Sequence, residues 1–271
     1  MQIINTLTNL LKTNKQGEKK NFKKYFLSFF LLIALQVSIY IISGLLIKDS
    51  LHLTKYICQK NDSKNNGFWI QILNLGFDGK QGLSDQVCEK LKWTVIFYSL
   101  FFPCVYVLAP FLIYKYLDKK TERQLLISLF ILVIVSLGFF IIFPVEVITE
   151  FQFKNLEPET NIIDWMITSI YKADNNSRFN SLPSLHVGLS WLCYVGFRKK
   201  QTKPIPKTLV YSKLFFCIMV FISTFAIKQH YIMDGIVAIL LVEIIFFCVG
   251  KWMDKSRQLY LKPSIAIKKT L

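Results

Sequence analysis

Long hydrophobic runs dominate the chain and alternate with shorter polar segments. A helix needs roughly 20 mostly apolar residues to cross the hydrocarbon core of a bilayer. Six runs meet or approach that length, at residues 26–47, 93–114, 125–143, 183–197, 208–227 and 231–250. A Lys-rich segment precedes the first run and is longer than the basic region of a signal peptide, so we expect an uncleaved membrane anchor. The pattern predicts an all-α polytopic membrane protein with a bundle of six transmembrane helices.

Prolines modify two of these runs. Pro103 and Pro110 lie inside the second run and predict a kink, which membrane helices tolerate when neighbouring groups satisfy the freed carbonyls. The fourth run is short and begins at Pro183, a residue that suits the first turn of a helix because its missing N–H is not needed there. We therefore expect this helix to begin inside the bundle, below the membrane surface.

Lysine and arginine are distributed unevenly between the connecting segments. Alternate segments hold 21 basic residues against four acidic ones, whereas the other two long segments, 48–92 and 144–182, hold ten against eleven. Because basic residues accumulate on the cytoplasmic side, both termini are predicted to be cytoplasmic, and 48–92 and 144–182 to face the outside or periplasm. If the basic residues served only solubility, the four basic segments would have no reason to occupy every second segment between the hydrophobic runs. These segments are 1–25, 115–124, 198–207 and 251–271.

Composition agrees with this assignment. The 271 residues are 53% hydrophobic with a mean hydropathy of +0.39, which excludes an ordinary soluble two-domain protein. The net charge of +16 would by itself suggest a nucleic-acid partner. Since the excess lies in the predicted cytoplasmic segments, we instead expect contact with anionic inner-leaflet lipids. The predicted organisation is a basic N-terminus (1–25), a membrane domain (26–250) and a basic tail (251–271).

Six cysteines do not form a recognisable framework. Two of them, Cys58 and Cys88, share the first predicted outward loop, where either a disulfide or two separate thiols fits an oxidising compartment. No Cys/His spacing indicates zinc, and we expect neither a metal nor a cofactor. The other four fall in hydrophobic runs and are interpreted as small apolar residues: Cys104, Cys193, Cys217 and Cys248.

The first candidate chemical site is the segment Asn180–His186 at the start of the fourth run. A helix that opens with Pro183 and Ser184 has several N–H groups without intrahelical partners, and together with the helix dipole they favour a bound anion such as phosphate. His186 falls in the first turn, where it is placed to give a proton to a leaving oxygen. An ordinary serine N-cap beside a buried histidine is the alternative.

The second candidate site is Ser223–Asp234, which joins the last two runs on the same predicted outward side. His230 and Asp234 are four residues apart and would share one helix face. A carboxylate bonded to one ring nitrogen fixes the tautomer and leaves the other nitrogen free to attack. A purely structural His–Asp pair is the alternative, although ionisable groups at membrane helix ends are costly and usually functional.

These two segments resemble the type 2 phosphatidic-acid phosphatase superfamily, whose signatures are written KxxxxxxRP, PSGH and SRxxxxxHxxxD. Residues 183–186 match the second signature with Leu for Gly, as in a branch that includes proteins similar to inositol-phosphoceramide synthase. Ser223, His230 and Asp234 match the spacing of the third. The resemblance implies a six-helix bundle in which His230 forms a phosphohistidine, Asp234 orients it and His186 protonates the leaving alcohol. It also implies that Ser184 and adjacent N–H groups hold the phosphate.

The chain departs from these signatures at its phosphate-binding cations. Thr224 stands where the third signature has Arg, and residues 143–147 lack the Lys/Arg-Pro element of the first. Phosphoryl transfer depends on positioning and on cations that offset charge on the phosphate oxygens. Lys228 is the first candidate replacement, followed by Arg178 and then Lys154. An inactive relative that retains the histidines is an open alternative.

The sequence thus predicts a multi-pass enzyme of the inner or plasma membrane that hydrolyses a lipid phosphomonoester or pyrophosphate at the outer leaflet. A head-group phosphotransferase using the same histidines is the nearest alternative, and a non-catalytic membrane protein is the other. The predicted partners are a phosphorylated lipid and the bilayer, and the sequence indicates no oligomeric state. Within the last two runs, Lys213 and Glu243 are expected to pair or share a polar network, unless Lys213 extends to the head groups.

Overall fold

The computed structural model describes residues 22–49, 85–142, 153, 155–174, 181–202 and 204–268, and within these ranges no residue lies in a β-strand. The Cys58–Cys88 disulfide stays a prediction, because Cys58 lies outside these ranges. The helices in chain order are α2 (Phe22–Asp49), α5 (Asp85–Leu91), η2 (Lys92–Thr94), α6 (Val95–Phe102), η3 (Pro103–Leu108), α7 (Ala109–Tyr116), α8 (Lys119–Ile142), α9 (Ile162–Asp174), α10 (Leu185–Arg198), α11 (Lys207–Ala226) and α12 (Ile232–Lys268).

The helices have the length and composition of membrane spans. Four stretches of the described chain are long and apolar enough to cross a bilayer: Gln86–Tyr116, Lys119–Ile142, Lys207–Ala226 and Ile232–Ser256. Helix α2 has 28 residues and is apolar over Tyr25–Ser38 where its side chains are described, and α10 has only 14 residues. The protein is therefore an all-helical membrane protein, whereas six spans and cytoplasmic termini stay predictions.

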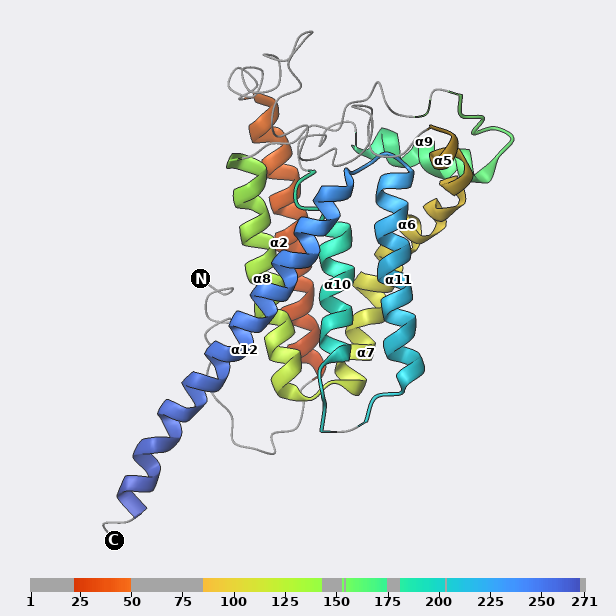
Figure 1. The fold of residues 1–271 in the computed structure, drawn as a ribbon. Helices are drawn as coiled ribbons and strands as arrows, with labels where there is room; N and C mark the ends of the chain where they lie inside the picture. Colours follow the sequence, from red (N-terminus) through yellow and green to blue (C-terminus); the bar gives the residue numbers. More distant parts are fainter. Residues whose placement is uncertain are drawn as a thin grey trace.

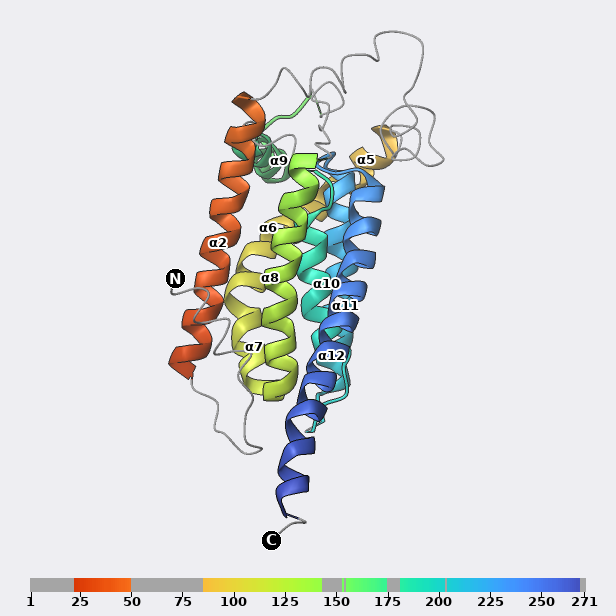
Figure 2. The same cartoon turned by 90° about the vertical axis from the view of Figure 1, so that its left-hand side faces the viewer.

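Helix α10 lies at the centre of the bundle, where it packs against α8, α11 and α12 (Figures 1 and 2). Leu189, Leu192 and Val195 are buried on it. Figure 1 shows that α10 begins deeper in the bundle than the neighbouring ends of α11 and α12. Helix α10 begins at Leu185 with Ser184 as its N-cap, so Pro183 precedes the helix and does not form its first turn as predicted. The deep start of α10 nevertheless places the Pro-Ser-Leu-His segment inside the bundle.

Pro103 changes the helix type in the second run, as its position predicts. The chain is α-helical in α6, continues as a π-helix over η3, and returns to α-helix in α7. Proline has no N–H to donate and crowds the preceding turn, so a local change to wider hydrogen bonding is a common response. The second run is therefore a single path of helical segments whose helix type changes at Pro103.

The expected pairing of Glu243 with Lys213 is wrong. Glu243 accepts hydrogen bonds from Trp191 Nε1 at 3.0 Å and from Arg198 Nη2 at 2.8 Å, both on α10. Lys213 Nζ instead lies 5.8 Å from the centroid of the Phe197 ring. The reason is that α10 packs on both α11 and α12 and supplies partners to each. Chain position could not reveal this intervening helix.

One end of the bundle carries a structure that we call the cap, defined as Phe153 with residues 155–174 and therefore including α9. Figure 1 shows α9 lying across the ends of the spanning helices. Ile167 of α9 is fully buried in a cluster with Val95, Tyr98 and Ile227. This cluster joins the cap to α6 and to the turn between α11 and α12.

The opposite end of the bundle gathers basic segments. The amide of Asp118 donates to Gln201 Oε1 at 2.9 Å, which holds the 115–124 and 198–207 loops together. Lys120 forms an ion pair with Asp254, which brings in the chain beyond residue 250. Three of the four basic segments therefore meet at the end away from the cap.

Candidate active site

His230 lies in the turn between α11 and α12, with its Nδ1 facing three oxygens. Nδ1 is 3.4 Å from Asp234 Oδ2, 3.3 Å from Ser181 Oγ and 3.1 Å from the Ser181 carbonyl oxygen. A ring nitrogen among such acceptors is favoured as the protonated one, which leaves Nε2 with its lone pair. The predicted His–Asp pair is therefore formed, and its geometry leaves the second nitrogen available.

Asp234 connects the two sequence segments that carry the candidate chemistry. Its side chain is fully buried, and Oδ2 accepts hydrogen bonds from the Ser181 hydroxyl and, at 2.9 Å, from the Tyr231 amide. Its carbonyl oxygen accepts the Ser184 amide at 3.1 Å. The start of α12 is thereby fastened to the segment that opens α10.

The turn that carries His230 is built from the carbonyls that end α11. The amides of Gln229 and His230 donate to the Thr224 carbonyl at 3.0 and 3.1 Å, and the amide of Lys228 donates to Phe225 at 3.1 Å. Such bonds satisfy carbonyls that would otherwise be unpaired at a helix C-terminus. Thr224 thus shapes the turn through its backbone, whereas the third signature uses the Arg side chain at this position.

The ring of His186 lies edge-on beside the ring of His230. The two ring centroids are 5.9 Å apart, with the planes inclined by 62°. Aromatic rings of α6 surround His186, with centroids of Tyr98 at 4.4 Å and Phe101 at 4.6 Å. The structure therefore brings both predicted histidines together, beside an apolar wall.

Ser184 precedes α10 but does not cap it through its side chain. The residue is fully buried, its hydroxyl makes no hydrogen bond within the described residues, and its amide is used by Asp234. An ordinary serine N-cap is therefore not what the structure contains. A buried hydroxyl without a partner costs free energy, so this serine is an unpaired polar group at the start of α10.

The candidate cations are only partly covered by the structure. Lys228 is buried, and its Nζ lies 4.6 Å from the centroid of the Phe153 ring. Arg178, Lys154 and residues 143–147 lie outside the described residues. Lys228 is thus the candidate whose surroundings are known.

Sequence reasoning missed Ser181. It lies two residues before Pro183 and reaches both His230 and Asp234, which lie 49 and 53 residues further along the chain. A serine in a polar segment gives no local signal of such a contact. The aromatic wall from α6 was missed for the same reason, because hydrophobic residues in a membrane run look alike in sequence.

The described part of the chain contains no group of three or more His, Cys, Asp or Glu side chains arranged to hold a metal ion.

Comparison with known proteins identifies a family. The family model described as the PAP2 superfamily matches residues 71–248. No curated protein and no solved structure matches the chain significantly. The matched range contains both histidines and Asp234.

Proposed function

Since that match makes the chain a member of the PAP2 superfamily, we propose that it hydrolyses a lipid phosphomonoester or pyrophosphate at the outer leaflet, through a phosphohistidine on His230. Superfamily members are typically phosphatases, which supports a phosphoric-ester hydrolase in general. The observation that carries the proposal is the pairing of His230 Nδ1 with buried Asp234, opposite His186 at 5.9 Å.

In the first step, Nε2 of His230 attacks phosphorus and the bond to the lipid oxygen breaks. Asp234 and Ser181 retain the Nδ1 proton and offset the positive charge that develops on the ring. His186 gives its proton to the leaving oxygen, so the lipid departs as an alcohol. In the second step, His186 takes a proton from water, water attacks phosphorus and the P–N bond breaks.

The phosphate oxygens need donors and cations during both steps. Ser184 offers a buried hydroxyl without a protein partner, beside the first amides of α10. Lys228 is the proposed replacement for the Arg of the third signature. Arg178 and Lys154 are proposed as further phosphate-binding residues.

The outward direction of the site rests on charge. The histidines lie at the cap end of the bundle, and three predicted cytoplasmic segments meet at the other end. Because basic segments prefer the cytoplasmic side, the site would open to the outer leaflet of a plasma or inner membrane. A phosphorylated lipid in that leaflet is the proposed substrate.

Transfer of the phosphate or head group to a lipid hydroxyl is the second candidate function. Leu185, which replaces the glycine of the second signature, favours it, as does the sequence Lys228–Tyr231. The two functions share the first step and differ only in whether water or a lipid hydroxyl attacks second.

A lipid panel tests both functions. Purified protein in detergent is offered phosphatidic acid, phosphatidylglycerophosphate, polyprenyl pyrophosphate and phosphorylated lipid A, while free phosphate and new phospholipid are followed together. We expect phosphate release from at least one lipid, and a loss of roughly a thousandfold or more in His230→Ala. Tyr211→Phe, at an exposed position on α11, is the control.

Two results would contradict the proposal. New phospholipid without free phosphate would replace hydrolysis by transfer. Turnover that is unchanged in His230→Ala would remove the catalytic interpretation altogether.

A further inference from the structure

The cap is firmly built around Asp164 of α9. The carbonyl of Glu157 accepts the amides of Thr160 and Asn161 at 3.2 and 3.0 Å, and Asn161 Oδ1 accepts the amide of Ile163 at 2.9 Å. Asp164 Oδ2 then accepts the Glu157 amide at 3.0 Å. The side chains of Asn161 and Asp164 therefore fix the turn that leads into α9.

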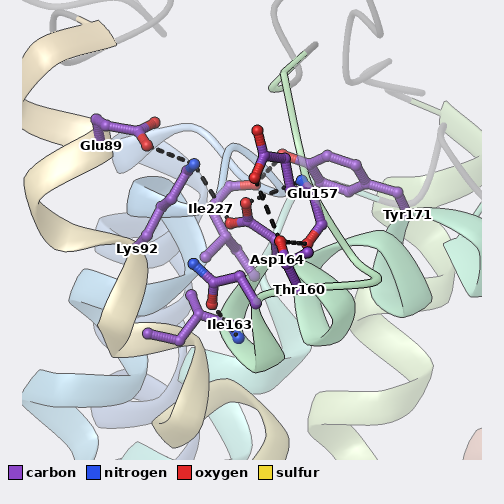
Figure 3. Close-up of polar contacts among 9 residues, drawn as sticks. Glu89, Lys92, Glu157, Thr160, Ile163, Asp164, Tyr171 and Ile227 are labelled. Atoms are coloured by element: carbon purple, nitrogen blue, oxygen red, sulfur yellow. Dashed lines mark hydrogen bonds and ion pairs between the residues drawn. The ribbon is translucent and has the colours of Figure 1, made fainter.

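Lys92 fastens this cap to the bundle. Its Nζ lies 2.5 Å from Glu89 Oε1 and 3.3 Å from Asp164 Oδ1, and Figure 3 shows it between the two carboxylates. The same Nζ lies 4.9 Å from the centroid of the Phe153 ring. Since Asp164 is buried, this charge-assisted contact is shielded from solvent.

The cap contacts the turn that carries His230, on both sides of the Ile227–Lys228 peptide bond. The Tyr171 hydroxyl donates to the Ile227 carbonyl at 2.9 Å (Figure 3), and the Phe153 ring lies 4.6 Å from Lys228 Nζ. Burial raises the pKa of Tyr171, so its hydroxyl stays protonated and remains a donor at neutral pH.

Lys228 needs such support because its backbone is in the left-handed region. Its φ is 58°, a conformation that a residue with a side chain adopts at an energetic cost unless its surroundings hold it there. A lysine side chain also has four flexible methylene groups. Packing its ammonium on an aromatic face restricts where that charge can lie.

From these contacts we propose that Tyr171 and Phe153 are positioning residues that hold the Lys228 ammonium where it meets the substrate phosphate. The proposal rests on the proposed function, in which Lys228 binds the phosphate that His230 attacks. Tyr171 fixes the backbone immediately before Lys228, and Phe153 fixes the end of its side chain. Neither residue touches the reacting atoms.

A double-mutant cycle tests whether the cap acts through Lys228. Tyr171→Phe, Phe153→Leu and Lys228→Met are compared singly with the two double variants that contain Lys228→Met. The assay uses the panel lipid that the wild type turns over fastest, together with the inhibition constant of inorganic phosphate. Each cap variant alone should lower kcat/KM roughly three- to tenfold and weaken phosphate inhibition, and neither should add a loss to Lys228→Met.

The control is Tyr211→Phe, which removes an exposed hydroxyl on α11 and should change neither quantity. Thermal unfolding in detergent confirms that the compared variants are folded, and Phe153→Leu tests the proposal without changing the hydrogen bond of Tyr171. The proposal would be overturned if a cap substitution lowered kcat/KM by the same factor in the Lys228→Met background as in the wild type. It would also be overturned if the inhibition constant of phosphate were unchanged in Lys228→Met. Full turnover in His230→Ala is a separate result that overturns the proposed function itself.

Discussion

At the scale of single residues, Ser181 and Ser184 perform different tasks although only two residues separate them. The Ser181 hydroxyl is paired with Asp234 and approaches His230. The Ser184 hydroxyl is equally buried but makes no hydrogen bond within the described chain. One serine therefore completes the protein's own network, and the other has no hydrogen-bond partner within that network.

This difference predicts an unusual response to Ser184→Ala. Because the hydroxyl has no protein partner, its removal should leave the thermal unfolding midpoint unchanged or slightly raised. Loss of a phosphate ligand should nevertheless reduce kcat/KM by roughly tenfold or more. Unfolding in detergent and initial rates measure the two effects on the same preparation.

Ser128→Ala on α8 is the matched control, since its hydroxyl is also buried without a hydrogen bond. It should resemble Ser184→Ala in stability but retain wild-type kinetics. If Ser184→Ala keeps full kcat/KM, then this serine does not bind the phosphate.

At the scale of elements, the site depends on how closely α12 approaches α11 just after the turn that carries His230. Gly235 follows Asp234, and a Cβ placed there would lie 2.3 Å from Cε2 of Phe221 on α11. A glycine is therefore required unless the Phe221 ring moves. This contact helps to set where Asp234 stands relative to His230.

Gly235→Ala should consequently lower both stability and activity, because Phe221 or α12 must shift to admit the methyl group. Gly138→Ala on α8 is the opposite case, since nothing lies within 4 Å of its added Cβ. There the better helix propensity of alanine should leave the unfolding midpoint unchanged or raise it. Equal unfolding midpoints and equal turnover in the two variants would contradict the close approach at Gly235.

The sequence identifies the long helices well and the cap poorly. The runs 125–143 and 208–227 lie within about six residues of the bounds of α8 and α11, because apolar length alone determines such spans. Helix α9 has 13 residues of mixed polarity, and its burial depends on Val95 and Lys92, which are distant in sequence. Contacts between residues that are distant in sequence also explain why the contacts of Ser181 were not predicted and why the partner of Glu243 was predicted wrongly.

At the scale of the whole molecule, charge and chemistry occupy opposite ends. The basic loops and Asp254 are joined at one end, and the two histidines lie with the cap at the other. The sequence alone predicts this separation, because both candidate sites fall beside segments with few excess basic residues. The net charge of +16 is thus concentrated in segments that the sequence predicts to be cytoplasmic, and it gives no indication of the substrate.

In the proposed reaction, His230 carries the phosphoryl group between the two steps. Rapid acid-free quenching with a ³²P-labelled lipid that the protein turns over, followed by peptide mapping, tests it most directly. We predict a label that is stable to alkali and labile to acid, located on His230 and missing from His230→Ala. A label that persists in His230→Ala, or turnover without any labelled protein at times shorter than one catalytic cycle, would contradict the account.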